Sequence, residues 1–154
     1  GVHLDVVGHG NYVTALKTRT SELGMGDRVT FRGHMPQPEV LDALRQGDLF
    51  CYPTSASEGF PKVVLEAMST GLPIITTRVS VLPKLMESGA GLLLDDDSPS
   101  NVAQAVRDCL ASPQRYVAMS TASAATAKTY SLERWGQFIG DELRRAWGPL
   151  QGDA

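Results

Sequence analysis

Two hydrophobic patterns alternate along the chain. Short runs rich in valine, leucine and isoleucine predict strands, and longer stretches with apolar residues every three or four positions predict helices. The runs cover residues 2–7, 28–33, 48–52, 72–77 and 91–94. The longer stretches cover residues 11–23, 37–46, 61–70, 82–87, 98–110, 113–127 and 131–147. Because strands separated by helices form parallel sheets, the pattern predicts an α/β fold with a doubly wound, Rossmann-like sheet.

The size and composition of the chain suit one globular domain. The sequence has 154 residues, of which 42% are hydrophobic and 20% charged. We expect one domain over residues 1–147 and a flexible tail, rich in glycine, proline and aspartate, over 148–154. The net charge of −3 argues against a nucleic-acid partner. Two cysteines, no membrane-length apolar run and no leader-like N-terminus lead us to expect reduced thiols and a cytoplasmic protein.

The loop that leaves the third predicted strand has the most informative sequence. In a doubly wound sheet, ligands bind beyond the carboxyl ends of the strands. Pro61 is expected at the first position of the following helix, whose N-terminus favours an anion such as a phosphate, and Gly59 lets the backbone approach a ligand. Glu58 stands just before this helix, and Glu66 stands five residues after Pro61, where it can accept hydrogen bonds from a ribose diol. The spacing also fits an interpretation without a ligand, in which Glu58 stabilises the helix start and Glu66 is solvated.

Other candidate sites have weaker support. Gly8 and Gly10 follow a predicted strand and open a helix, but the third glycine of a dinucleotide fingerprint is absent, so a tight turn and a phosphate loop both remain open. The acidic run 95–97 suits a loop better than a metal site, and the three histidines have no partners at metal-ligand spacing. We therefore expect no metal site. Apolar residues at helical spacing in the last helix predict a packing stripe: Trp135, Phe138 and Ile139.

The residues from Glu58 to Met68, followed by Gly71-Leu72-Pro73-Ile74-Ile75, resemble a known signature. It is the Glu-x7-Glu motif of retaining GT-B glycosyltransferases of family 4, the glycosyl transferases group 1. Further runs similar to that family's C-terminal, donor-binding domain are residues 4–10, 27–33, 46–54 and 87–94. The resemblance covers about residues 2–145 in order.

The resemblance implies a role for each residue of the motif. Glu58 would be the catalytic residue that faces the donor sugar. Gly59, Phe60 and Pro61 would lie near the sugar and phosphates, Lys62 and Val63 beside the nucleotide, and Glu66 on the ribose hydroxyls. Gly8 and Gly10 would also belong to the donor site. Such enzymes usually need no divalent metal, so we expect no cofactor, and a UDP- or GDP-linked sugar as donor substrate.

The sequence departs from the family pattern in two places. The family's donor domain begins with a further strand and helix, which carry a basic pair for the diphosphate, and an acceptor-binding N-terminal domain precedes it. The chain is therefore expected to be a C-terminal fragment or part of a split protein, inactive alone, whose flanking strands pair directly or borrow a strand. The loop 78–84 also lacks the family's glycine pair and later glutamate, although Arg78 and Lys84 bring positive charge.

These observations predict the donor-binding domain of a retaining, hexosyltransferase-type enzyme that transfers a sugar from a nucleotide diphospho-sugar to an acceptor. The alternative is a non-catalytic nucleotide-sugar-binding or assembly module. Expected partners are the nucleotide sugar and the absent acceptor domain. The open sheet edge and the last helix are candidate surfaces for self-association, and the resemblance also allows peripheral membrane association of the full-length enzyme.

Overall fold

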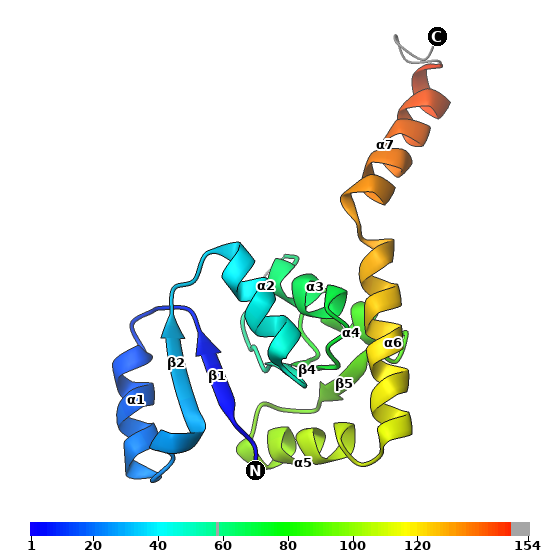
Figure 1. Ribbon diagram of the computed structural model, residues 1–154. Coiled ribbons are helices and arrows are strands. Elements are labelled where there is room, and N and C mark those ends of the chain that lie inside the picture. The colour runs from blue at the N-terminus through cyan, green and yellow to red at the C-terminus, as the bar shows by residue number, and fades with distance from the viewer. Residues whose placement is uncertain (58, 149–154) are drawn as a thin grey trace. The chain divides into compact units, whose positions relative to one another are not determined.

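A computed structural model describes residues 1–57 and 59–148 of the chain, and Figure 1 shows the order of its elements. The strands are β1 (Leu4–Val7), β2 (Val29–Gly33), β3 (Phe50–Tyr52), β4 (Ile74–Thr77) and β5 (Gly91–Leu94). The α-helices are α1 (Val13–Glu22), α2 (Gln37–Gln46), α3 (Lys62–Ser69), α4 (Leu82–Met86), α5 (Pro99–Cys109), α6 (Pro113–Thr129) and α7 (Leu132–Trp147). A short 3-10 turn, η1, covers Gly26–Arg28. Every predicted strand and helix is present, with ends that move by a few residues.

All strand pairs are parallel, which confirms the predicted α/β class. The described residues form two separate sheets, β1-β2 and β3-β4-β5, so β1 and β3 do not pair with each other. The chain divides into two compact units, residues 1–43 and 44–154, with α2 crossing the boundary. One domain over residues 1–147 stays a prediction, and the predicted tail lies outside the described residues except for Gly148.

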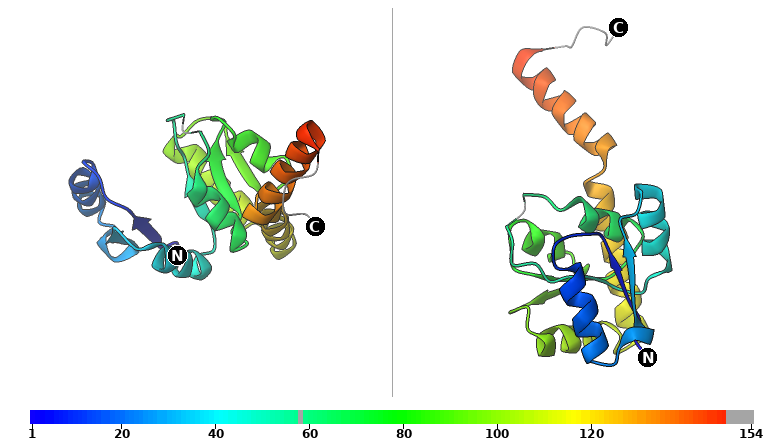
Figure 2. Two further views of the ribbon diagram at one scale, coloured as in Figure 1. Left: turned by 90° about the horizontal axis from the view of Figure 1, so that it is seen from above. Right: turned by 90° about the vertical axis from the view of Figure 1, so that its left-hand side faces the viewer.

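The first unit contains a two-stranded ladder, the helix α1 and the turn η1. β1 and β2 pair with Asp5 opposite Thr30, and α1 lies beside this ladder (Figure 2). The ammonium group of Lys17 on α1 lies 5.7 Å from the centroid of the Phe31 ring on β2. Val6 and Phe31 are half-buried, and no described side chain of residues 1–43 is fully buried. The well-packed core therefore belongs to the second unit.

In the second unit, helices cover both faces of the sheet (Figure 1). The register aligns Cys51, Ile75 and Leu92 across the three strands, so these side chains share one face. That face packs against Ala105 and Cys109 of α5. On the other face, α3 and α4 contribute fully buried side chains: Val64, Met68, Leu82 and Leu85. β4 is central and buried along its whole length, and its sequence is Ile-Ile-Thr-Thr.

A buried hydrogen bond links α6 to the connection between α3 and β4. The hydroxyl of Ser123, which is fully buried, donates a hydrogen bond to the carbonyl of Leu72 at 2.7 Å. Leu72 follows the end of α3, where Gly71 has a φ of 81° and turns the chain into β4. This contact fixes the start of β4, and β4 in turn positions the loops at its carboxyl end.

The buried thiol of Cys109 makes the free energy of unfolding depend on pH in the alkaline range. Cys51 and Cys109 are both free, and burial raises the pKa of Cys109 from 9.0 to about 11. Between these values the unfolded chain loses a proton that the folded chain keeps, so the free energy of unfolding falls as pH rises. Urea unfolding between pH 7 and pH 10.5 should show this fall, and Cys109→Ala should reduce the slope. An equal slope in both proteins would contradict the assignment.

Candidate functional site

Two threonines of β4 hold the loop that leaves β3. The hydroxyl of Thr76 donates to the carbonyl of Tyr52 at 2.8 Å, and the hydroxyl of Thr77 donates to the carbonyl of Thr54. Both threonines are buried, and a buried hydroxyl needs a hydrogen-bond partner. The side chain of Thr54 accepts from the N–H of Ala56 at 3.1 Å and so tightens the next turn. The polar end of β4 therefore positions the loop that the sequence marked as informative.

The loop ends at the start of α3, one residue later than predicted. Pro61 lies at the N-cap, with φ −74° and ψ 101°, and not at the first helical position. Proline fits both positions, because its fixed φ suits extended and helical backbone alike. Pro61 is buried and has no side chain that could cap the helix. The first N–H groups of α3 thus present the positive end of the helix dipole, and Pro61 does not cap them.

The predicted donor-binding residues of the second unit lie together along this segment. Gly59 and Phe60 are exposed in the loop, and the ring of Phe60 lies 5.5 Å from the ring of Tyr130, between centroids. Lys62 is exposed on the first turn of α3, Val63 is half-buried, and Glu66 is half-buried one turn further on. Because Val64, Ala67 and Met68 form the buried face of α3, Lys62 and Glu66 lie outside that face. One turn separates Lys62 from Glu66, about 6 Å along the axis.

The remaining predicted residues lie elsewhere or are not described. Glu58, the predicted catalytic residue, lies outside the described residues. Gly8 and Gly10 belong to the first unit, at the carboxyl end of β1. The N–H of Gly8, whose φ is 122°, donates to the carbonyl of Gly33 at 2.7 Å, and the carbonyl of Gly10 accepts from the N–H of Val13 at 3.2 Å. These bonds fit the tight-turn interpretation, and a role of these glycines in binding stays a prediction.

The two cations expected to compensate for the altered loop have other neighbours. The guanidinium of Arg78 lies 3.5 Å from the carboxylate of Asp95, and both side chains are exposed. Lys84 lines a hollow of about 570 Å³ between α4 and α6, together with Glu87, Thr126 and Tyr130. Salt bridges between exposed groups are weak, so Asp95 holds the Arg78 side chain only loosely.

The acidic run after β5 forms a turn. The carboxylate of Asp96 accepts from the N–H of Ser98 at 2.9 Å, and hydrogen bonding to Ser98 lowers the pKa of this carboxyl. The hydroxyl of Ser98 in turn accepts from the N–H of Asn101 and caps α5. Within residues 1–57 and 59–148, no group of three or more His, Cys, Asp or Glu side chains is placed to hold a metal ion.

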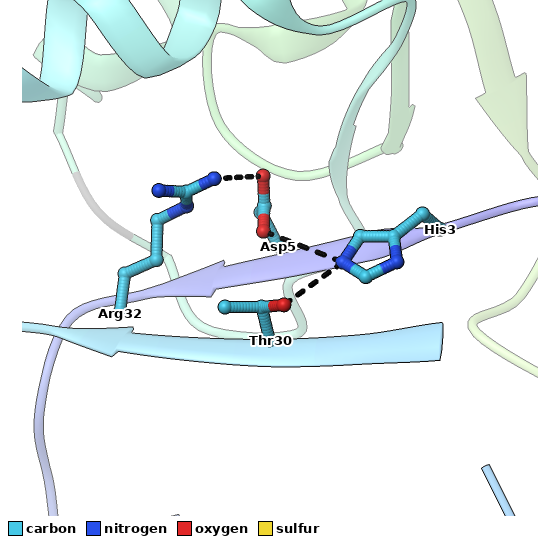
Figure 3. Close-up of polar contacts among 4 residues, drawn as sticks. All are labelled: His3, Asp5, Thr30 and Arg32. Carbon is cyan, nitrogen blue, oxygen red and sulfur yellow. Dashed lines mark hydrogen bonds and ion pairs between the residues drawn. The ribbon is translucent and has the colours of Figure 1, made fainter. Parts of the chain in front are cut away.

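A polar cluster on the first unit was not predicted (Figure 3). The Nε2 atom of His3 lies 2.9 Å from the hydroxyl of Thr30 and 3.8 Å from the carboxylate of Asp5. The guanidinium of Arg32 donates to the other Asp5 oxygen at 3.0 Å, and this bond raises the pKa of Arg32. The sequence did contain a signal for this cluster, namely polar residues at positions 3, 5, 30 and 32. Alternate residues of paired strands share a face, so these four side chains can meet. Both contacts of His3 use the same ring nitrogen, so Asp5 does not orient the ring as in a catalytic triad.

Comparison with protein families identifies the chain. The family model described as "Glycosyl transferases group 1" matches residues 1–126. The chain belongs to this family. Among curated relatives, a D-inositol 3-phosphate glycosyltransferase of Segniliparus rotundus is 32% identical over 138 residues, which cover 86% of this chain and 30% of the relative. A GDP-mannose-dependent alpha-(1-6)-phosphatidylinositol monomannoside mannosyltransferase of Mycolicibacterium smegmatis is 30% identical over 139 residues, covering 86% and 35%. The chain therefore spans about a third of the length of these group 1 relatives.

Solved structures share the fold of this group 1 chain. HepE of Anabaena, crystallised with UDP, matches with a TM-score of 0.83 and 24% identity, over 94% of this chain and 41% of HepE. The C-terminal domain of a glycosyl transferase group 1 protein of Francisella tularensis matches with a TM-score of 0.65 and 16% identity, over 78% of this chain and 62% of that chain. The fold is thus that of the C-terminal, Rossmann-like domain of GT-B proteins. None of the helices in the described parts has the length and hydropathy needed to cross a bilayer.

Proposed function

We propose that this chain is the donor-binding domain of a retaining glycosyltransferase of family 4. Its substrate would be a nucleotide diphospho-sugar, and the nucleotide would be UDP or GDP. The observation that carries the proposal is the segment from Gly59 to Glu66. Its N-cap residue, Pro61, supplies no side-chain cap to α3, and the carboxylate of Glu66 lies about one turn further along the helix. One extended ligand with an anionic diphosphate and a ribose diol fits this order of groups.

Each group would act on a different part of the donor. The first N–H groups of α3 and the Lys62 ammonium would meet the negative charge that develops on the diphosphate when the glycosidic bond breaks. Glu66 would accept hydrogen bonds from the ribose hydroxyls. Glu58 would position the donor sugar, and Gly59 leaves room for close approach, because a Cβ there would meet no atom within 4 Å.

The named relatives support a nucleotide sugar as ligand. HepE has been crystallised with UDP and with UDP-glucose, and the Mycolicibacterium smegmatis relative is named as GDP-mannose-dependent. The two names differ in base, so the base used by this chain needs its own measurement. Sugar transfer by the whole protein is part of the proposal, and so is its cytoplasmic location.

Calorimetric titration with UDP, GDP and ADP tests the proposal. We expect UDP or GDP to bind with a dissociation constant between micromolar and low millimolar, and ADP to bind more weakly. The corresponding nucleoside, which lacks the diphosphate, should bind at least tenfold more weakly, because it misses the helix start and Lys62. No heat of binding from any of the three would contradict the proposal. Binding without sugar transfer by the complete protein would instead favour a nucleotide-sugar-binding module.

A further inference from the structure

The loop between β4 and α4 contains a serine in an unusual backbone conformation. Ser80 has a φ of 52°, and it is the one non-glycine residue with positive φ in the described parts of the chain. A side chain with a Cβ is unfavourable in this left-handed region, where glycine fits best. The sequence therefore places a hydroxyl group at a position where the backbone alone would favour glycine.

The hydroxyl of Ser80 links this loop to the candidate donor segment. It donates a hydrogen bond of 3.1 Å to the carbonyl of Gly59, which is 21 residues away in the sequence. The hydroxyls of Thr76 and Thr77 make similar bonds to the carbonyls of Tyr52 and Thr54. Three hydroxyls from the end of β4 and its loop thus hold three carbonyls along the connection from β3 to α3. Gly59, which accepts from Ser80, is the carbonyl of the three that lies nearest the start of α3.

This bond determines the direction of a neighbouring N–H group. The carbonyl of Gly59 and the N–H of Phe60 belong to one planar trans peptide, so they point in opposite directions. When the Gly59 carbonyl is held toward Ser80, the Phe60 N–H must point away from Ser80. A peptide without this restraint can rotate, and its N–H then spends less time in any one direction.

We propose that Ser80 is a positioning residue of the donor site. Its hydroxyl orients the Gly59–Phe60 peptide so that the Phe60 N–H can donate to an anionic oxygen of a nucleoside diphosphate. The inference rests on the proposed function, because it assumes that the segment before α3 meets the diphosphate. Ser80 itself does not contact the ligand in this account, and its effect passes through the peptide that it holds.

Substitution by glycine separates positioning from stability. Ser80→Gly removes the hydroxyl and also removes the unfavourable Cβ, so the thermal midpoint should stay equal or rise. Affinity for the nucleotide that the protein binds should nevertheless fall roughly three- to tenfold, as expected for one lost orienting hydrogen bond. Ser80→Ala should lose the same affinity and gain no stability. As a matched control, Ser88→Gly removes a hydroxyl that accepts from Thr126 at 2.7 Å, and it should leave affinity unchanged.

Two measurements together decide the outcome. Calorimetry gives the affinity, and hydrogen–deuterium exchange of a peptide covering residues 54–61, without nucleotide, reports the loop directly. We expect faster exchange in Ser80→Gly and Ser80→Ala than in wild type. If the wild-type protein binds a nucleotide and both Ser80 variants bind it equally well, the inference is wrong and the proposed function stands. If the wild-type protein binds none, both the proposed function and the inference fail.

Discussion

Replacing Gly91 with alanine is expected to destabilise the second unit by about 3 kcal/mol or more. Gly91 begins β5 and lies opposite Ile74 of β4. A Cβ at this position would lie 1.8 Å from the carbonyl oxygen of Ile74 and 2.7 Å from its nitrogen. Both are backbone atoms of the central strand, so they cannot move aside without displacing β4. The same strand carries Thr76 and Thr77, so nucleotide binding should be lost together with stability.

Urea unfolding of Gly91→Ala measures this effect, and Gly136→Ala is its matched control. Gly136 lies in α7, and a Cβ there would meet nothing within 4 Å. In a helix this substitution usually stabilises by about 0.5–1 kcal/mol, so the same chemical change should have opposite signs at the two sites. Equal urea midpoints for Gly91→Ala and wild type would show that the β4–β5 contact is looser than described.

Replacing Glu66 with alanine is expected to weaken nucleotide binding by roughly ten- to a hundredfold. Hydrogen bonds that involve a charged group contribute about 1.5–3 kcal/mol, and about 1.4 kcal/mol corresponds to a factor of ten in affinity. Glu66→Gln keeps the shape of the side chain and one acceptor oxygen, so its affinity should fall between wild type and Glu66→Ala. Both variants should remain folded, because Glu66 lies outside the buried face of α3.

Glu87→Ala is the control for the lost charge. Glu87 is an exposed glutamate of the same unit, beside the hollow between α4 and α6. The substitution Glu87→Ala removes the same negative charge as Glu66→Ala, but Glu87 lies outside the segment from Gly59 to Glu66. Calorimetry should therefore give the wild-type affinity for Glu87→Ala. Equal losses in Glu87→Ala and Glu66→Ala would mean that overall charge, and not a contact of Glu66 with the ribose, determines the affinity.

The positions of strands and helices were largely predictable from local sequence. The Ile-Ile-Thr-Thr strand follows Gly71 and Pro73 and is buried on both faces, so its apolar run stands out. Ser98 and Ser131 precede helices and cap them with their hydroxyls, as such residues commonly do. Pro61 was misplaced by one position because proline is compatible with both the N-cap and the first helical turn. Such local rules place elements well and their exact ends less well.

The pairing of strands into sheets was less accessible. Predicted parallel strands suggest one sheet, but the described residues form two ladders, β1-β2 and β3-β4-β5. Which strands pair depends on the tertiary arrangement of the chain. The hydrophobic periodicity of a single strand carries no information about that arrangement. The last helix was a candidate surface for self-association. Trp135, Phe138 and Ile139 were predicted as a packing stripe, and each is about half exposed in the described structure.

The candidate site was predictable only in part. Counting residues from Pro61 placed Lys62 and Glu66 on successive turns of α3, because a helix has a fixed geometry. The links that hold the preceding loop were not predictable. The bonds from Thr77 to Thr54 and from Ser80 to Gly59 join residues more than 20 positions apart. Nor does the sequence around Ser80 signal a positive φ, since glycine is the usual marker of that conformation.

Mapping a bound nucleotide sugar onto the chain tests the central claim most directly. Titration of the ¹⁵N-labelled protein with UDP-, GDP- and ADP-linked sugars, followed by two-dimensional NMR, reports every backbone amide at once. We predict that one donor shifts the amides of residues 54–66 and 76–80, with the largest changes at Phe60, Lys62 and Val63. Shifts confined to the hollow lined by Lys84 and Thr126, or no shifts with any donor, would contradict the account.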